Sequence, residues 1–471
     1  MFLVHFETIG CRLNQSETEA LADVFLKAGF KIFDKRKNTS EVVLVFVNTC
    51  TVTSKAEQKC RHSIRSCLKK FPNALILVSG CYAQLDGKNI EKISQVVKVF
   101  PGMHKGLLAK FPKYYYQKFL LAPEKLKANP LELSLDIFSD FTASHFDASL
   151  QLEQNKKAVS NIKNKNLKKE KPKFAFELAT SNFAFHSRAT LKIQDGCNSA
   201  CSFCRIHLAR GASVSLDVNE VIARAKKIED AEKNEIVLTG VNLAQYKSDG
   251  VNFPKLLISL LQNTKKIKFR ISSFYPEAIS DEFLDAISSE RVCPYFHLSV
   301  QSGSERILTL MKRPANIEKI YRVCEELRSV KFKPFIGADI IAGFPSESDD
   351  DFEKTYTLCK ELAFTHIHAF PFSPRPKTLA YDLKPKVPER IAGERVACLN
   401  ALSETNYKAY LKSVCGSCVT GIVEKSQTGK KILTENYLLL PLKYEKNAEN
   451  LKSGSLVKVK INETFCELCS V

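Results

Sequence analysis

The sequence has no tryptophan, no run of about 18 apolar residues, and no basic segment followed by an apolar stretch at its start. The missing apolar run argues against a membrane-spanning helix. The missing basic segment argues against a signal peptide, so residues 2–8 are predicted to form a first strand. We therefore expect a cytoplasmic protein that makes no use of a membrane.

The composition is that of a globular protein with an excess of positive charge. Of the 471 residues, 44% are hydrophobic, and the length predicts about three domains. Lys and Arg number 70 against 51 Asp and Glu, which gives a net charge of +19. Such an excess suits a polyanionic partner such as RNA, through phosphate neutralisation and counterion release. Eight lysines lie within residues 156–173, a segment poor in large apolar residues and therefore typical of a solvated linker.

Cysteine is abundant, with 16 residues. In a reducing cytosol, metal or redox chemistry explains so many cysteines better than disulfides do. Cys197, Cys201 and Cys204 follow the apolar residues 189–193 in a short loop with the spacing C-x3-C-x2-C. A tight loop of three thiolates can hold three irons of a four-iron cluster and leave the fourth iron open to a small chelating ligand. Cysteines that merely pack do not need this spacing, so we predict an iron–sulfur site.

The first hundred residues alternate strand and helix, which predicts a parallel, doubly wound sheet resembling a Rossmann fold. Two helices are predicted to begin at the capping boxes Ser16-x-x-Glu19 and Ser54-x-x-Glu57 and to end near residues 28 and 70. The strands are predicted at residues 2–8, 42–47 and 75–79.

A cysteine follows each of these strands within one to three residues: Cys11, Cys50 and Cys81. Because the carboxyl ends of parallel strands meet at the edge where ligands bind, we expect the three thiols to converge although 39 (50−11) and 31 (81−50) residues separate them. This predicts a second three-cysteine cluster site. The alternative is that each cysteine is a small residue that fits a strand-to-helix turn. Cys60 and Cys67 lie seven residues apart on one helix and are expected to pack there.

From residue 185 the alternation returns, and six βα units without a seventh or eighth predict a partial, open TIM-like barrel. Strands are predicted at residues 189–193, 235–239, 266–272, 295–301, 335–343 and 366–370. Helices are predicted at residues 218–230, 253–262, 280–289, 304–311, 316–330 and 350–363.

Several strand ends of this barrel carry residues suited to binding a nucleotide and an amino acid moiety. Small residues there let a nucleotide approach the backbone, and amide or hydroxyl side chains can form hydrogen bonds with it. The alternative for each is a local role, such as a helix start. The candidates are Gly240, Asn242, Gln301, Ser302 and Gly343.

The C-terminal part is predicted to be a helix over residues 389–412 followed by a small, basic β-barrel. This barrel suits either RNA binding or a plain structural cap. Two Cys-x2-Cys pairs flank it and would hold zinc if the ends of the barrel meet: Cys415, Cys418, Cys466 and Cys469. The cysteines at positions 293, 324, 359 and 398 are interpreted as packing residues.

These motifs together resemble the methylthiotransferase family of radical S-adenosylmethionine (radical SAM) enzymes over essentially the whole chain. The segments at residues 8–17, 47–53 and 80–84 resemble the family's N-terminal domain, and those at 191–198, 238–242, 270–273, 301–304 and 371–375 resemble its radical SAM core. The tail is similar to the RNA-binding TRAM domain. The implied boundaries are an N-terminal domain at 1–120, a lysine-rich linker at 121–182, the radical SAM core at 183–405 and the TRAM-like domain at 406–471.

The resemblance is closest to the branch that modifies N6-threonylcarbamoyladenosine at position 37 of tRNA, in the anticodon stem-loop. It implies methylthiolation at C2 of that base, two [4Fe-4S] clusters and SAM. One cluster would be held by Cys197, Cys201 and Cys204, where SAM is cleaved, and the other by Cys11, Cys50 and Cys81. A flavodoxin- or ferredoxin-type electron donor and a sulfur donor are also implied, and we expect a monomer. The alternatives are isopentenyladenosine in tRNA, an aspartate of a ribosomal protein, and a noncatalytic iron–sulfur protein.

Two departures from the family pattern lie directly after the core cysteines. Relatives usually have a proline near His207, and they carry an Arg-Ser-Arg-like segment where this chain has Ala-Ser-Val-Ser at residues 212–215. The missing arginines change the substrate contacts that the resemblance implies for this loop. His207 is interpreted as an exposed bystander, with a compensating contact as the alternative.

Overall fold

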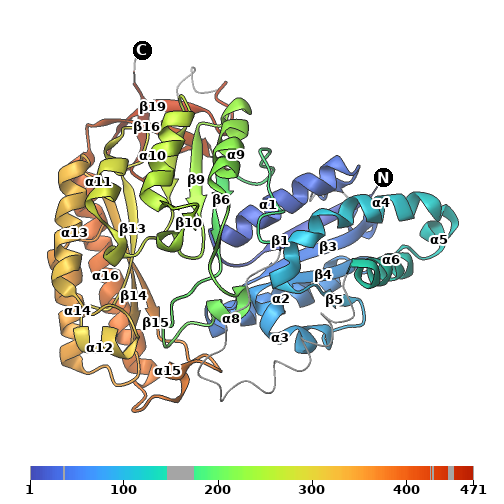
Figure 1. The fold of residues 1–471 in the computed structure, drawn as a ribbon, viewed down its shortest axis with the longest axis horizontal. Coiled ribbons are helices and arrows are strands. Elements are labelled where there is room, and N and C mark those ends of the chain that lie inside the picture. Colours follow the sequence, from blue (N-terminus) through green and yellow to red (C-terminus); the bar gives the residue numbers. More distant parts are fainter. Residues whose placement is uncertain are drawn as a thin grey trace. The chain divides into compact units, whose positions relative to one another are not determined.

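The computed structural model describes residues 2–34, 38–145, 174–424, 426, 429–443 and 450–469. The chain divides into two compact units (Figure 1). The first comprises residues 1–184, 195–198 and 205–214, and the second comprises residues 185–194, 199–204 and 215–471. Among the residues so described, no helix has the length and apolar character needed to cross a membrane.

The first unit is built on a five-stranded parallel sheet in the order β2-β1-β3-β4-β5. Strand β3 is buried at all eight of its residues, as a central strand covered on both faces must be. The predicted parallel sheet and its three main strands are therefore confirmed. The strand bounds are Leu3–Thr8 (β1), Lys31–Ile32 (β2), Val42–Thr49 (β3), Leu75–Gly80 (β4) and Val97–Val99 (β5).

Helices cover both faces of this sheet. Alternate residues of β3 enter two separate cores: Phe46 packs with α1, α4 and α6, whereas Val47 packs with α2 and α3. The helices and 3-10 turns of this unit are α1 (Arg12–Lys27), η1 (Thr39–Glu41), α2 (Ser54–Lys70), α3 (Cys81–Glu91), η2 (Gly102–Ala109), α4 (Phe111–Leu121), α5 (Pro123–Ala128), α6 (Pro130–His145) and α8 (Ile206–Arg210).

Neither predicted capping box forms. Helix α1 begins five residues earlier than expected, with Cys11 and not Ser16 at its N-cap. The Ser16 hydroxyl instead donates to the Leu13 carbonyl at 2.8 Å. Helix α2 is capped by Thr53, whose side chain accepts a hydrogen bond from the Ala56 amide. The helices were predicted correctly, but their first turns were not.

The predicted linker over residues 121–182 is wrong in its first part. Helices α5 and α6 occupy residues 123–145, and Ile137, Phe138 and Phe141 of α6 are buried in the core of the first unit. Their apolar spacing is that of a packed amphipathic helix. The lysine-rich residues 156–173 lie outside the described residues.

The second unit contains six parallel strands in the order β6-β9-β12-β13-β14-β15, which confirms the partial barrel (Figure 1). Isolated bridges, Phe269 to Val292 and Phe274 to Leu298, connect its two three-stranded halves. The strands are β6 (Ala189–Lys192), β9 (Glu235–Thr239), β12 (Lys268–Ile271), β13 (Tyr295–Gln301), β14 (Phe335–Ala342) and β15 (His366–Pro371).

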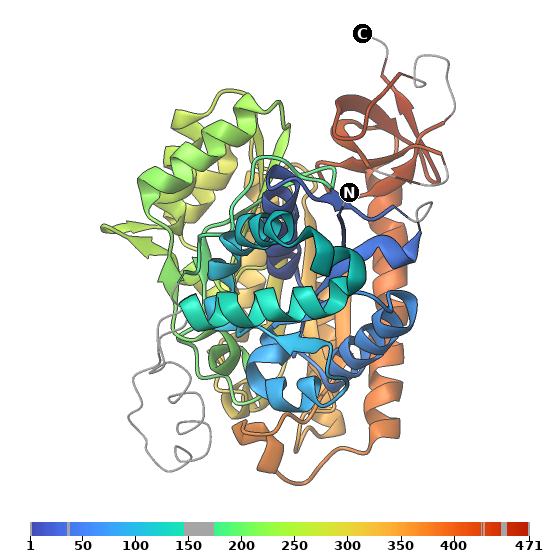
Figure 2. The ribbon, with the colours of Figure 1, turned by 90° about the vertical axis from the view of Figure 1, so that its right-hand side faces the viewer.

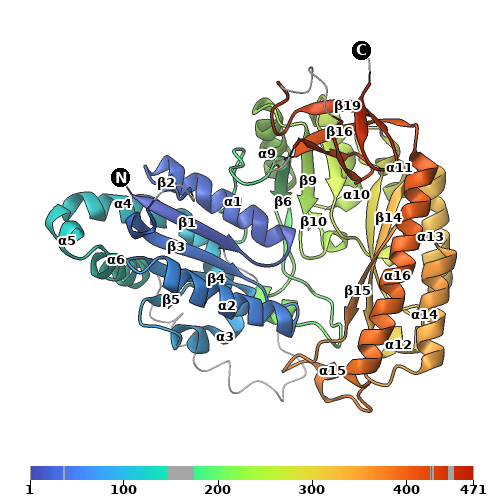
Figure 3. The ribbon, with the colours of Figure 1, turned by 180° about the vertical axis from the view of Figure 1, so that it is seen from behind.

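Helices lie on the outside of these strands, and α16 runs along β14 and β15 (Figure 3). The predicted helices of the barrel are confirmed within one to two residues at most ends. They are α9 (Val218–Asp230), α10 (Phe253–Asn263), α11 (Asp281–Ser288), α12 (Glu305–Leu310), α13 (Ile317–Val330), α14 (Asp349–Glu361) and α16 (Glu389–Val414). The structure adds a short helix that was not predicted, α15 (Leu379–Asp382). The short elements are β7 (Gln194–Asp195), β8 (Val214–Ser215), η3 (Leu243–Gln245), β10 (Lys247–Ser248), β11 (Val251–Asn252) and η4 (Pro276–Ala278).

The chain ends in a curled, five-stranded antiparallel sheet, a half-barrel in the order β18-β17-β16-β19-β20. It follows α16 directly (Figure 2). Its apolar core includes Tyr295 and Phe335, the first residues of β13 and β14. The half-barrel therefore covers the amino ends of the barrel strands. Its strands are β16 (Cys418–Glu424), β17 (Lys431–Thr434), β18 (Leu439–Pro441), β19 (Leu456–Ile461) and β20 (Cys466–Leu468).

A buried ion pair at the base of the barrel gives a pH-dependent stability. Arg270 donates to both Glu235 oxygens, at 2.7 and 2.8 Å, and Arg188 lies 3.4 Å from the same carboxylate. Burial opposes ionisation of Glu235, but these two guanidinium groups outweigh it and lower its pKa to about 2 from 4.5. Because the pKa in the folded protein is depressed, this stabilisation is fully present above pH 4.5 and is lost as the pH falls towards 2.

Glu235→Gln is accordingly expected to cost about 3 kcal/mol at pH 7, since it leaves a buried guanidinium without its carboxylate. The difference from the wild-type chain should shrink progressively below pH 4.5. Urea unfolding of both chains from pH 7 down to pH 3 measures this. Glu220→Gln, which removes an exposed partner of Arg224, is the control and should cost under about 0.5 kcal/mol at every pH.

Candidate active site

Three cysteines of the first unit lie just beyond the carboxyl ends of neighbouring strands. Cys11 is the N-cap of α1 after β1, Cys50 follows β3 directly, and Cys81 is the first residue of α3 after β4. The order β1-β3-β4 places these strands side by side. The structure thus brings the three thiols to one edge of the sheet, where the sequence placed them. Cys50 and Cys81 are buried and Cys11 is exposed.

The turns that carry these cysteines depend on two glycines with positive φ. Gly10 has φ of +115°, and a side chain there would place its first carbon 2.9 Å from the Cys50 sulfur. Gly80 has φ of +104°, and a side chain there would lie 2.4 Å from the Thr49 carbonyl oxygen. Only glycine adopts these conformations without strain, so both residues keep the cysteine edge compact.

Electrostatics at this edge also favour a bound cation. Burial, together with the neighbouring Cys81 and Cys11, raises the pKa of the Cys50 thiol to about 12. Thiolates gathered at one sheet edge are stabilised by positive charge near them. Sulfur ligands on a buried edge are what an iron–sulfur cluster requires, so the residues present fit that group.

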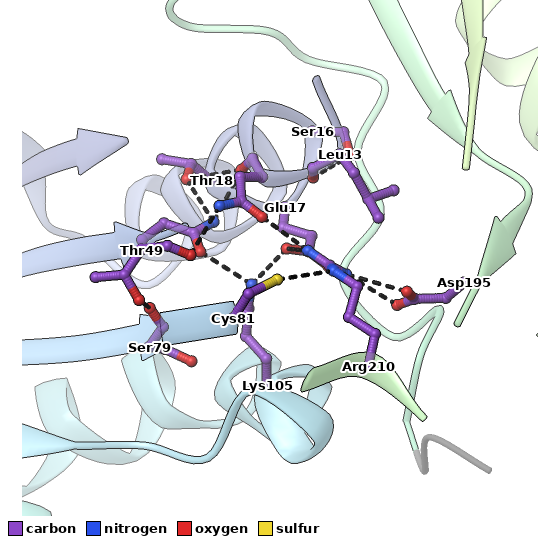
Figure 4. A network of polar contacts seen from close by, with 12 residues as sticks. Leu13, Ser16, Glu17, Thr18, Thr49, Ser79, Cys81, Lys105, Asp195 and Arg210 are labelled. Carbon is purple, nitrogen blue, oxygen red and sulfur yellow. Dashed lines mark hydrogen bonds and ion pairs between the residues drawn. The ribbon is translucent and has the colours of Figure 1, made fainter. Parts of the chain in front are cut away.

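A buried ionic network supports Cys81 (Figure 4). The Arg210 side chain donates from Nε to the Cys81 sulfur at 3.2 Å, and from Nη1 to Glu17 at 3.0 Å. Nη1 also lies 3.1 Å from both oxygens of Asp195, and Nη2 donates to Asn14 at 2.7 Å. Burial opposes the charge on Arg210, but Asp195, Cys81 and Glu17 outweigh it and raise its pKa. Arg210 therefore remains positive beside a cysteine of the edge.

A second cation, Lys105, closes the network on its other side. Its ammonium group contacts Glu17 and donates to the Asn48 side chain at 3.0 Å. Asn14 ties the network to the strand ends, donating to the carbonyls of Ile9 and Thr49 at 2.9 and 3.0 Å. Burial lowers the pKa of Lys105, and the adjacent Glu17 opposes this shift. One guanidinium and one lysine thus face two carboxylates beside the cysteines. Sequence reasoning did not identify this network, although Asn14, Glu17 and Asn48 lie within segments it singled out.

The cysteine loop predicted after β6 passes from one unit to the other. In the first unit, the Cys197 amide donates to the Gly211 carbonyl at 3.0 Å. A side chain at Gly196, whose φ is +67°, would lie 2.0 Å from the Ala212 carbonyl oxygen. The segment at residues 212–215, which departs from the family pattern, therefore begins in direct contact with the backbone at Gly196 and Cys197. His207, the other departure from the family pattern, is half-buried, whereas an exposed residue was expected.

In the second unit, Cys201 and Cys204 belong to a turn that is fixed by hydrogen bonds within the turn and to helix α12. The Cys204 amide donates to the Cys201 carbonyl at 3.2 Å, and the Ser202 hydroxyl donates to the Leu310 carbonyl at 2.7 Å. Burial opposes the charge on Arg313, but Glu277, Tyr275 and Cys201 outweigh it and raise the pKa of this guanidinium. Arg313 was also missed by sequence reasoning. It places a cation beside Cys201, as Arg210 does beside Cys81.

The five candidate nucleotide and amino acid contacts all lie at carboxyl ends of barrel strands, but several have local roles. Asn242 caps η3 by accepting from the Ala244 amide at 3.2 Å, and the Ser302 hydroxyl is buried against Thr355 at 3.2 Å. Gly343 leaves no room for a side chain, which would lie 2.4 Å from the Ala392 side chain. For these three, packing and capping account for the residue type. Gly240 leaves space for the Gln194 side chain, and Gln301, with φ of +73°, stays a predicted contact.

The zinc site considered at the C-terminal sheet is not formed. The Cys418 and Cys469 sulfurs are 2.9 Å apart, but Cys466 is buried with its sulfur against the Pro441 carbonyl. In the described part of the chain, no three of the four thiols lie within 4.8 Å of one another. The zinc hypothesis is therefore wrong. Cys60 and Cys67 are buried in the core of the first unit, as expected for packing residues.

Comparisons with known proteins agree with this architecture. Residues 191–359 match the radical SAM superfamily, and residues 3–102 match a family described as uncharacterized protein family UPF0004. The solved structure of TsrM, a radical S-adenosylmethionine methyltransferase from Kitasatospora setae, has a TM-score of 0.53 and 12% identity, covering 80% of this chain and 77% of TsrM. The fold and the site therefore define a radical SAM enzyme, a class that uses an iron–sulfur cluster and SAM.

Full-length relatives are more specific. The chain is 44% identical to the threonylcarbamoyladenosine tRNA methylthiotransferase MtaB of Treponema pallidum, covering 98% of both chains. It is 32% identical to MtaB of Aquifex aeolicus, covering 97% of this chain and 100% of the relative, and 32% identical to MtaB of Bacillus subtilis, covering 98% and 94%. The chain belongs to the MtaB family of threonylcarbamoyladenosine tRNA methylthiotransferases.

Proposed function

We propose that this enzyme transfers a methylthio group to C2 of N6-threonylcarbamoyladenosine at position 37 of tRNA, next to the anticodon. The observation that carries the proposal is the 44% identity, over 98% of both chains, to a relative named for this substrate. The net charge of +19 suits the polyanionic substrate. As an enzyme that acts on tRNA, it is proposed to work in the cytoplasm, as a monomer.

Cys197, Cys201 and Cys204 are the proposed ligands of the radical SAM cluster. When bound, the cluster and SAM supply the radical that removes hydrogen from the base carbon. Other residues of the chain orient these ligands. The Gly211 carbonyl accepts a hydrogen bond from the Cys197 amide, and Arg313 places a positive charge beside Cys201. Gly240, Asn242, Gln301, Ser302 and Gly343 are the proposed surroundings of SAM.

Cys11, Cys50 and Cys81 are the proposed ligands of a second [4Fe-4S] cluster, which would carry the sulfur to be transferred. The support is their convergence at one sheet edge and the guanidinium of Arg210, which donates to the Cys81 sulfur. A hydrogen bond to a ligand sulfur stabilises its negative charge and tunes the cluster. Arg210 is therefore proposed as a positioning residue of this site.

Turnover would also require partners. A one-electron reductant of the flavodoxin or ferredoxin type would reduce the radical SAM cluster, and a sulfur donor would restore the transferred atom. The C-terminal half-barrel is proposed to contact the tRNA. Its lysines at positions 431, 458 and 460 suit a phosphate backbone.

Mass spectrometry of nucleosides from total tRNA tests the function in cells with and without the gene. We expect 2-methylthio-N6-threonylcarbamoyladenosine to disappear in the deletion and to return with the wild-type gene, but not with a gene encoding Cys11→Ala. The unmodified N6-threonylcarbamoyladenosine should accumulate by an equal amount.

Two other outcomes would overturn this assignment. Loss of methylthio-isopentenyladenosine alone would make that base the substrate. If all methylthio-adenosines persist and a ribosomal protein instead loses a methylthio-aspartate, the target is that protein. Neither alternative is favoured by the relatives, which are named for threonylcarbamoyladenosine.

A further inference from the structure

Inside the barrel, three side chains outside both cysteine sites form a compact group. His297, Asp339 and His368 lie on the adjacent strands β13, β14 and β15. One ring nitrogen of each histidine and one carboxylate oxygen of Asp339 all lie within 4.8 Å of one another. His297 Nε2 is 2.9 Å from Asp339 Oδ1, and His368 Nδ1 is 3.2 Å from the same oxygen.

The strand register explains why these side chains meet. Asp339 pairs directly with His368, and His297 pairs with Gly337, two residues before Asp339 on the same face of β14. A side chain at Gly337 would place its first carbon 2.8 Å from His297 Nδ1. The glycine therefore lets the His297 ring lie across β14, and this position brings its Nε2 atom to Asp339.

The donor atoms of the group suit a cation. The Asp339 carboxylate lies between the two imidazole rings, 2.9 Å from His297 Nε2 and 3.2 Å from His368 Nδ1. The group therefore offers one negative oxygen and two imidazole nitrogens. The His368 side chain is 53% exposed, so a small ion has access from solvent.

We propose that His297, Asp339 and His368 form a binding site for a divalent transition-metal ion. Two imidazole nitrogens and one carboxylate oxygen are a common donor set for zinc and iron(II). Zinc binds such donors at about 2.0–2.2 Å. The carboxylate oxygen already lies 2.9 and 3.2 Å from the two imidazole nitrogens, separations that fit two ligands of one ion at that distance. The His368 donor lies on the exposed side of the group.

Zinc binding by the protein with its iron–sulfur clusters reconstituted tests the site. Zinc affinity is measured by competition with a chromophoric chelator, and X-ray absorption at the zinc edge identifies the donor atoms. We expect one zinc per chain with nitrogen and oxygen neighbours at about 2.0–2.2 Å. His368→Gln and Asp339→Asn should each weaken this binding at least tenfold.

A matched variant separates the site from its surroundings. His366→Gln changes the same type of side chain two residues away on β15, outside the three donors, and should keep the wild-type zinc affinity. His368 is half-exposed, so its replacement should not unfold the chain, and circular dichroism checks this. Zinc with only sulfur neighbours at about 2.3 Å, or equal affinity in all four chains, would overturn the proposal.

Discussion

Cys197→Ala is expected to abolish reductive cleavage of SAM, whereas Cys11→Ala should leave cleavage intact and abolish methylthiolation. The reason is that the two cysteines belong to separate proposed clusters, and the open iron that would bind SAM belongs to the Cys197 loop. Quantifying 5′-deoxyadenosine and the modified nucleoside in the same reaction, with dithionite as reductant, measures both activities. Each lost activity should fall to the level of an enzyme-free reaction.

Cys324→Ala serves as the control, because Cys324 is a fully buried packing residue of α13. It should retain both activities and lose only about 1 kcal/mol of stability from the small cavity. Iron content provides a second readout, and each cluster-site variant should lose about half of the bound iron. SAM cleavage that survives Cys197→Ala would refute the assignment of the radical SAM ligands.

Arg210→Gln is expected to lower the apparent free energy of unfolding of the first unit by about 3–5 kcal/mol. In the wild-type chain, Arg210 and Lys105 balance Glu17 and Asp195 in a fully buried network. The variant removes the guanidinium that pairs with the two buried carboxylates of this network. Urea unfolding at pH 7, combined with limited proteolysis of residues 1–184, measures the loss.

Two further variants show whether charge or geometry is responsible. Arg210→Lys keeps the charge but not the fork of donors that reaches Cys81, Glu17 and Asn14 together, so an intermediate loss is expected. Arg224→Gln removes an arginine from a surface pair and should cost under about 0.5 kcal/mol. If Arg210→Gln unfolds at the wild-type urea concentration, the network contributes no stability.

Much of the fold was predictable because buried parallel strands are short apolar runs that end at recognisable turns. The segments 235–239 and 295–301 were predicted with the bounds that the structure gives to β9 and β13. The cysteine edge was predictable for a related reason, since each cysteine follows such a strand and parallel strands share one edge.

The errors arose where tertiary contacts replace a local pattern. The Ser16-x-x-Glu19 pattern suggests a capping box, but the Glu19 side chain instead accepts a hydrogen bond from the Ala184 amide at 2.7 Å. The Arg210 network joins residues 17, 105, 195 and 210, and no local spacing relates them. Likewise, the zinc hypothesis needed the ends of the half-barrel to bring four thiols together, and only Cys418 and Cys469 meet.

If the C-terminal half-barrel contacts the tRNA as proposed, its position sets a length scale for substrate binding. It covers the amino ends of β13 and β14, whereas Gln301 and Gly343 lie at their carboxyl ends. The eight residues of β14 correspond to about 26 Å at about 3.3 Å each. An RNA that contacts both the amino and the carboxyl ends of the barrel strands must extend over that distance. The half-barrel would therefore fix the separation between its own RNA contact and the target base. It would measure how far the target base lies from a second, remote feature of the tRNA, and leave the chemical identity of that base to be read at the other end.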